Sequence, residues 1–111
     1  MITLDPAQHS LLRVAQTLHA AADLARAAAH ADPGGHDTEF GVLTLLGLAA
    51  SLLPLDLPLT KDAVPSGHVR ALLEDAEAEL RRFPIASYPE GTVDLVVGLC
   101  DLIRRTQGER L

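Results

Sequence analysis

The feature that most constrains the fold of this chain is an uncharged run of 16 residues from Phe40 to Leu55. A membrane-spanning helix needs about 20 mostly apolar residues. This run is shorter, contains Thr44 and Ser51, and has no basic residue beside it. We therefore expect a helix that is buried on nearly all of its sides within a folded domain.

The rest of the sequence predicts an all-α four-helix bundle that forms a single domain over residues 1–111. Asp5 is a good N-cap, Pro6 suits the first helical position, and Gln8 can complete a capping box, so the first helix has a clear start. A Leu/Pro-rich strap is expected between the second and third helices. The predicted helices cover about residues 6–31, 38–53, 66–83 and 89–107.

Apolar residues recur at helical spacing in each of these segments. In the first helix they are Leu11, Val14, Ala15, Leu18, Ala22, Ala25 and Ala29. In the third helix they are Val69, Leu72, Leu73, Ala76, Leu80 and Phe83. The fourth helix is apolar around most of its circumference and leaves one narrow stripe for solvent, made of Asp94, Gly98, Asp101 and Arg105. Gly41, Gly47 and Gly98 lie inside apolar helices, where each costs about 1 kcal/mol relative to alanine. Close packing of helices or room for a ligand would explain this cost, and we favour close packing.

The uncharged second helix needs more cover than three partners in a chain of 111 residues easily provide. Two explanations stay open, and both can hold. The helix lies at the centre of the bundle, or one of its faces lies in a homodimer interface. The residues predicted for such an interface, on the second and fourth helices, are Phe40, Leu43, Leu46, Gly47, Ala50, Val96, Leu99 and Ile103.

Composition argues against several classes of function. The net charge of −6 would repel nucleic acid and anionic membranes, and the aromatic content of 3% provides no stacking platform for single strands. The single cysteine, Cys100, excludes an internal disulfide. No signal peptide is evident at the start, so we expect a cytoplasmic protein. Eight arginines against one lysine, with abundant alanine, suggest a bacterial source with a GC-rich genome.

The segment between the first two helices, His30 to Gly41, holds residue types that bind transition metals. These are His30, Asp32, His36, Asp37 and Glu39. Their spacing matches no known ligand pattern, and a Pro-Gly-Gly corner separates the histidines. We therefore interpret the segment as a solvated turn that ends one helix and caps the next, with no metal site.

Within this turn, the sequence PGGHDTEFG resembles the Gly-Gly-His-Ser attachment motif of peptidyl carrier proteins. The resemblance implies a small four-helix domain whose serine, at the start of the second helix, carries phosphopantetheine. Asp37 occupies the position of that serine and cannot carry the cofactor. No cofactor is therefore predicted.

Two pairs of acidic residues resemble the carboxylates of MazG-type nucleotide pyrophosphatases, which are all-α and magnesium-dependent. The pairs are Glu74 with Glu77 and Glu90 with Asp94. Facing carboxylates would suit Mg²⁺ and a polyphosphate. Glu90 and Asp94 are four residues apart where the family has three, and an acidic solvent-facing surface explains both pairs.

Three further candidates have simpler explanations. Cys100 lies among apolar residues of the fourth helix, as a small core residue does. His19 and Asp23 could pair across one helical turn, but no nucleophile accompanies them. His68 lies in the predicted first turn of the third helix, where the helix dipole disfavours its protonation.

These observations favour a noncatalytic, acidic, helical protein-interaction or regulatory module that is homodimeric through the second helix, the fourth helix or both. A basic protein would suit its charge as a further partner. The alternative is a helical protein that binds a small molecule, or a magnesium-type enzyme that uses acidic residues of the third and fourth helices. No catalytic, metal-binding or cofactor-binding residue is predicted.

Overall fold

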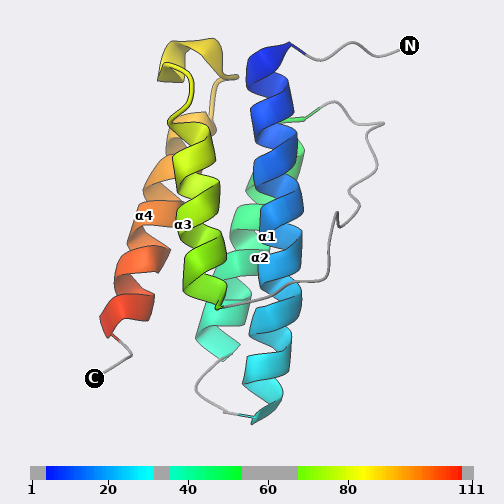
Figure 1. Cartoon of the computed structure of the whole chain (residues 1–111), viewed down its shortest axis with the longest axis vertical. Coiled ribbons are helices and arrows are strands. Elements are labelled where there is room, and N and C mark those ends of the chain that lie inside the picture. The colour runs from blue at the N-terminus through cyan, green and yellow to red at the C-terminus, as the bar shows by residue number, and fades with distance from the viewer. Residues whose placement is uncertain (1–4, 32–35, 54–67, 109–111) are drawn as a thin grey trace.

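The computed structural model describes residues 5–31, 36–53 and 68–108 of the chain (Figure 1). This part of the protein is an all-α four-helix bundle and contains no strand. Its α-helices are α1 (Pro6–Ala31), α2 (His36–Ser51), α3 (Val69–Leu80) and α4 (Thr92–Gly108), and one short 3₁₀ helix, η2 (Ile85–Ser87), precedes α4. Among the helices described, none has the length and apolar character needed to cross a membrane.

The four helices form a square in which each packs against two neighbours. The helix α1 contacts α2 and α3, and α4 contacts the same two helices from the other side. Figure 1 shows that α1 and α4 run in one direction along the bundle and that α2 and α3 run in the other. All four neighbouring pairs are therefore antiparallel, while α2 and α3, which are consecutive in sequence, lie on a diagonal.

The predicted start of α1 is confirmed. The Asp5 side chain accepts a hydrogen bond from the backbone N–H of Gln8 (2.8 Å), and the Gln8 side chain accepts one from the N–H of Asp5 (3.1 Å). This reciprocal pair satisfies two donors that a helix start otherwise leaves unpaired. The predicted apolar stripe of α1 is also confirmed from Leu11 to Ala25, because every member of it in that range is buried.

The other helix boundaries differ from the expected ranges by up to three residues. The helix α2 begins and ends two residues early, and α3 begins at Val69 because His68 is in an extended conformation (φ −113°, ψ 151°). The predicted cap Ser66 and the predicted strap lie outside the described residues. The helix α3 ends at Leu80, since Pro84 disfavours a helical Phe83 before it.

The start of α4 is set by Gly91. Its φ of +100° is incompatible with an α-helix, so α4 begins at Thr92 and not at residue 89. The Thr92 hydroxyl group donates to the carbonyl oxygen of Pro89 (2.7 Å), and the side chain of Thr92 is buried.

Two expectations about burial are wrong. The helix α2 is not buried on nearly all sides, because it lies at a corner of the square and exposes one face. The helix α4 exposes more than its narrow polar stripe, since Val93 and Val97 are also exposed. Each corner helix has two neighbours, and these cover only the side that faces the centre of the bundle.

The close approach of α2 and α4 depends on two glycines, as predicted for Gly41 and Gly98. A Cβ atom at Gly41 would lie 2.9 Å from Leu102 Cδ1, and one at Gly98 would lie 2.6 Å from Leu45 Cδ2. Gly47 is different and corrects the expectation for that residue. A Cβ atom there would meet nothing within 4 Å, so Gly47 is not needed for packing inside the monomer.

We expect the substitution Gly91→Ala to lower the free energy of unfolding by about 1–2 kcal/mol, because an L-residue at positive φ places its Cβ against the following carbonyl oxygen. The added Cβ would also lie 3.3 Å from Leu52 Cδ2. Urea denaturation measures the loss. The exposed neighbour Glu90 provides the control, since Glu90→Ala should change stability by less than about 0.5 kcal/mol. Equal effects of the two variants would contradict this account of the turn.

Candidate functional site

The most unusual surface of the molecule is the exposed apolar part of α2 and α4. Five large hydrophobic side chains are exposed within the described residues, and four of them lie on these two neighbouring helices. Phe40 (74% exposed) and Leu43 (41%) belong to α2, and Val97 (61%) and Val93 (55%) belong to α4. We call these four residues the α2/α4 apolar surface.

The predicted interface residues of α2 lie in part on this surface. Phe40, Leu43 and Gly47 are exposed, while Leu46 and Ala50 are half-buried. Phe40, Leu43 and Gly47 lie away from the buried stripe of α2, which is formed by Val42, Leu45 and Ala49, whereas Leu46 packs against the core.

On α4 the predicted interface residues lie closer to the core. Leu99 is fully buried in the monomer, and Val96 and Ile103 are half-buried and pack against the core. Sequence reasoning missed the exposed pair, Val93 and Val97. The sequence contains a signal for this pair. Leu95, Leu99 and Leu102 form an apolar stripe at i, i+4 and i+7. Val93 and Val97 stand two positions before Leu95 and Leu99, which places them on the opposite side of the helix.

A groove of about 230 Å³ separates α2 from α4 next to the α2/α4 apolar surface. Phe40 and Thr44 line it from α2, and Asp101 and Arg105 line it from α4. The Arg105 guanidinium group contacts the Asp101 carboxylate at 2.5 Å, one turn away on the same helix. The charges at this rim are therefore paired, and the floor of the groove is apolar.

A second groove, of about 400 Å³, lies between α3 and α4. It is lined by Glu74, Glu77, Arg81, Cys100, Ile103 and Arg104. Glu74 forms an ion pair with Arg70, and Glu77 forms one with Arg81. Cys100 is a half-buried free thiol at the edge of this groove, which makes it more accessible than the core position expected for it.

The structure does not bring the two acidic pairs of the magnesium hypothesis together. Glu74 and Glu77 lie beside Cys100 and Ile103, whereas Glu90 and Asp94 precede Cys100 by six residues or more. Six residues correspond to about 9 Å along a helix. In the part of the chain that the structure describes, no three His, Cys, Asp or Glu side chains gather in a way that could hold a metal ion.

The turn between α1 and α2 shows ion pairing where it is described. Arg26 Nε lies 3.4 Å from Glu39 Oε2, so this contact ties the end of α1 to the start of α2. Asp37 is exposed in the first turn of α2. The other residues named for a metal site there, His30, Asp32 and His36, have side chains outside the described part.

The two remaining histidine candidates lie apart from these surfaces. His19 Nδ1 is buried without a hydrogen-bond partner. His68 is exposed at the N-cap position of α3 and forms no side-chain capping hydrogen bond.

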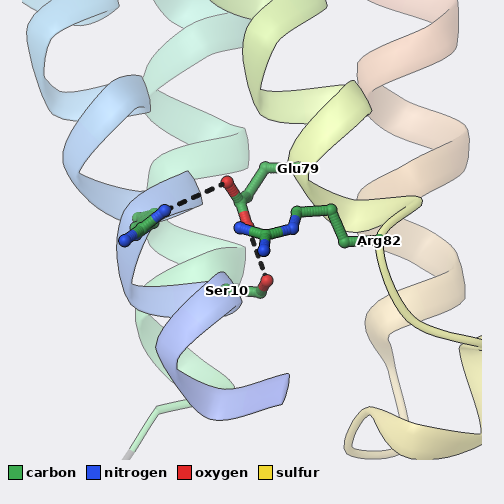
Figure 2. A network of polar contacts seen from close by, with 4 residues as sticks. Ser10, Glu79 and Arg82 are labelled. Carbon is green, nitrogen blue, oxygen red and sulfur yellow. Dashed lines mark hydrogen bonds and ion pairs between the residues drawn. The ribbon is translucent and has the colours of Figure 1, made fainter. Parts of the chain in front are cut away.

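Sequence reasoning also missed a polar cluster that joins α1 to the end of α3 (Figure 2). The Ser10 hydroxyl group, only 2% exposed, donates a hydrogen bond of 2.6 Å to Glu79 Oε2. Arg82 Nη1 lies 3.3 Å from the same oxygen, and Arg13 Nη1 lies 3.9 Å from Glu79 Oε1. Ser10 is three residues after Ala7 and four before Val14, both buried, and this spacing is the signal that could have placed it on the inner side of α1.

Tyr88 closes this end of the bundle. Its side chain is 7% exposed and meets the ring of Phe83 edge to face, with centroids 6.4 Å apart. Its hydroxyl group is buried without a hydrogen-bond partner. Burial raises the pKa of Tyr88 above 10, and the charge of Glu79 adds to the shift, while Ser10 and Arg82 oppose it.

Comparison of the chain with protein-family models, with curated proteins and with solved structures finds no match.

Removing the Glu79 carboxylate should destabilise the bundle. Glu79→Ala leaves the buried Ser10 hydroxyl group without its acceptor, which costs about 1–3 kcal/mol in the free energy of unfolding. The matched control is Glu74→Ala on the same helix, whose exposed pair with Arg70 is expected to contribute less than about 0.5 kcal/mol. Adding Ser10→Ala to Glu79→Ala should recover part of the loss in a double-mutant cycle. Strict additivity would contradict the contact.

Tyr88 should make the protein sensitive to alkaline pH. Its neutral form is favoured in the folded state, so above pH 10, its usual pKa, the unfolded state loses this proton first and the free energy of unfolding falls as pH rises. At pH 7, Tyr88→Phe should leave stability unchanged or raise it by about 1 kcal/mol, since the lost hydroxyl group has no partner. Chemical denaturation between pH 7 and 11 tests both statements. A variant as alkali-sensitive as the original chain would contradict the first.

Proposed function

We propose that this protein is a noncatalytic protein-interaction module that forms a homodimer through the exposed apolar residues of α2 and α4. The observation that carries the proposal is the concentration of exposed large hydrophobic side chains on these two helices, with Phe40 and Val97 the most exposed. Phe40 and Leu43 lie in the first half of α2, and Val93 and Val97 lie in the first half of the antiparallel α4, so a partner must span both helices to cover all four.

The outer faces of α1 and α3 support this assignment by contrast. Ion pairs lie along these helices, with Arg70–Glu74 and Arg81–Glu77 on α3 and Arg13–Glu79 between α1 and α3. Water solvates such pairs well, and burying them in an interface would cost desolvation energy. The outer face of α2 has no charged side chain after Glu39 and carries no such cost, whereas α4 has the exposed pair of Asp101 and Arg105 beside the groove.

Charge favours a second copy of the chain as the occupant of this surface. The protein has a net charge of −6, so two copies repel each other wherever their acidic side chains meet. Between Phe40 and Leu53, α2 has no charged residue. Two copies that meet along α2 can therefore bury apolar side chains without bringing like charges together there.

The acidic surface outside this interface suits a basic protein as a further partner, because complementary charge accelerates association and favours the correct partner. A cytoplasmic location is part of the proposal.

Sedimentation equilibrium ultracentrifugation tests the homodimer. We expect the mass to rise from monomer to dimer with concentration, and the double variant Phe40→Asp/Val97→Asp to remain monomeric. Both side chains are more than half exposed, so their replacement leaves the monomer core intact. Circular dichroism of the variant should show an unchanged helix content.

The matched control is Ile85→Asp. Ile85 is also an exposed large hydrophobic residue (49%), but it lies in η2 and not on the α2/α4 apolar surface. This variant should dimerise like the original chain. A monomer at all concentrations, or equal loss of the dimer in the control, would overturn the proposal.

A further inference from the structure

The outer face of α2 carries a short stripe of four uncharged residues. These residues, which we call the α2 stripe, are Phe40, Leu43, Gly47 and Ala50. Their spacing of three, four and three residues places them on one side of the helix, as in the seam of a coiled coil. Phe40, Leu43 and Gly47 are exposed and Ala50 is half-buried, so the monomer leaves this stripe largely uncovered.

The α2 stripe is large at one end and small at the other. Phe40 and Leu43 project from the first half of the helix. Gly47 and Ala50 follow in the second half, and the space outside Gly47 is open, since a Cβ atom there would meet nothing within 4 Å. The stripe therefore presents two large side chains followed by two small residues that leave the helix backbone accessible.

We propose that a second copy of the chain docks on this stripe with its own α2 antiparallel, about a twofold axis that passes between Leu43 and Gly47. In that register Phe40 lies opposite Ala50 of the partner subunit, and Leu43 lies opposite Gly47 of the partner subunit. Each large side chain meets a small residue, which is the condition for two helices to pack closely without voids. The inference rests on the proposed function and adds to it the helix, the direction and the register of the contact.

A parallel arrangement fits the same residues less well. It would place Phe40 against Phe40 and Gly47 against Gly47, so the two helices would be held apart at one end with a void at the other. It would also bring together the first turns of both copies, which contain the acidic residues Asp37 and Glu39. The last turn of α2 contains no basic residue that would favour a particular partner turn. The antiparallel arrangement separates these acidic turns and aligns the two helix dipoles favourably.

Disulfide cross-linking tests the direction. Two single-cysteine chains are prepared in a Cys100→Ala background, one with Phe40→Cys and the other with Ala50→Cys, and they are unfolded together, refolded and oxidised. The antiparallel register brings positions 40 and 50 of different copies together, so the mixture should yield the 40–50 cross-linked species. Each chain alone should yield almost none, because the two equivalent cysteines of its homodimer would lie about 15 Å apart along the axis, and a disulfide requires Cα atoms within about 7 Å.

The outcomes separate this inference from the proposed function. Cross-links only between like positions, in a chain that sedimentation shows to be dimeric, would overturn the antiparallel register and leave the homodimer standing. A chain that stays monomeric would overturn both.

A size substitution provides a second test that does not depend on cysteine. Gly47→Leu places a large side chain where the register puts Leu43 of the partner subunit, so we expect the dimer dissociation constant to rise at least tenfold, about the effect of losing one important interface contact. The variant should remain folded because space is open at that position. Ala27→Leu, at an exposed alanine of α1, is the matched control and should dimerise normally. A dimer that tolerates Gly47→Leu but is lost with Val97→Asp alone would place the contact on α4 and overturn the inference.

Discussion

The fold depends on the buried stripe of α1, which forms a common wall for two other helices. Leu11, Val14, Ala15 and Leu18 are fully buried between α2 and α3. Burying a leucine or valine side chain contributes about 1.5–3 kcal/mol. Among the described helices, α1 is the longest, with 26 residues. The glycines of α2 and α4 then set how closely the opposite wall can approach, and the Ser10–Glu79 hydrogen bond fixes α3 along α1.

The sequence predicted the number and positions of the helices well, and it predicted less well which faces of the helices are buried. The number of helices, the capping box at Asp5 and the stripe of α1 follow from local pattern, and all of them are confirmed. The start of α4 was predicted three residues too early, because Gly91 adopts a positive φ, which glycine permits but does not require. The predicted degree of burial of α2 was wrong, because an uncharged helix has the same sequence pattern whether its own chain or another chain covers it.

The candidate site shows the same division between local pattern and tertiary arrangement. Phe40 and Leu43 could be identified from the uncharged run, and both are exposed. On α4, valines and other apolar residues around most of the helix obscured the stripe of Leu95, Leu99 and Leu102, so buried Leu99 was selected and exposed Val97 was not. The partners of Ser10 could not be predicted, because Glu79 is 69 residues away in the sequence.

The diagonal position of α2 and α3 has a consequence for the order in which the chain can fold during synthesis. The inner side of α1 gains its α2 cover as soon as the chain reaches Ser51, but its α3 cover comes only after Leu80. Pairing across that separation must close a long loop, which slows folding compared with contacts between sequence neighbours. Until α3 has been synthesised, the side of α1 that α3 covers has no partner within the chain, and α3 and α4, which contact each other, can pack against α1 and α2 as a second hairpin.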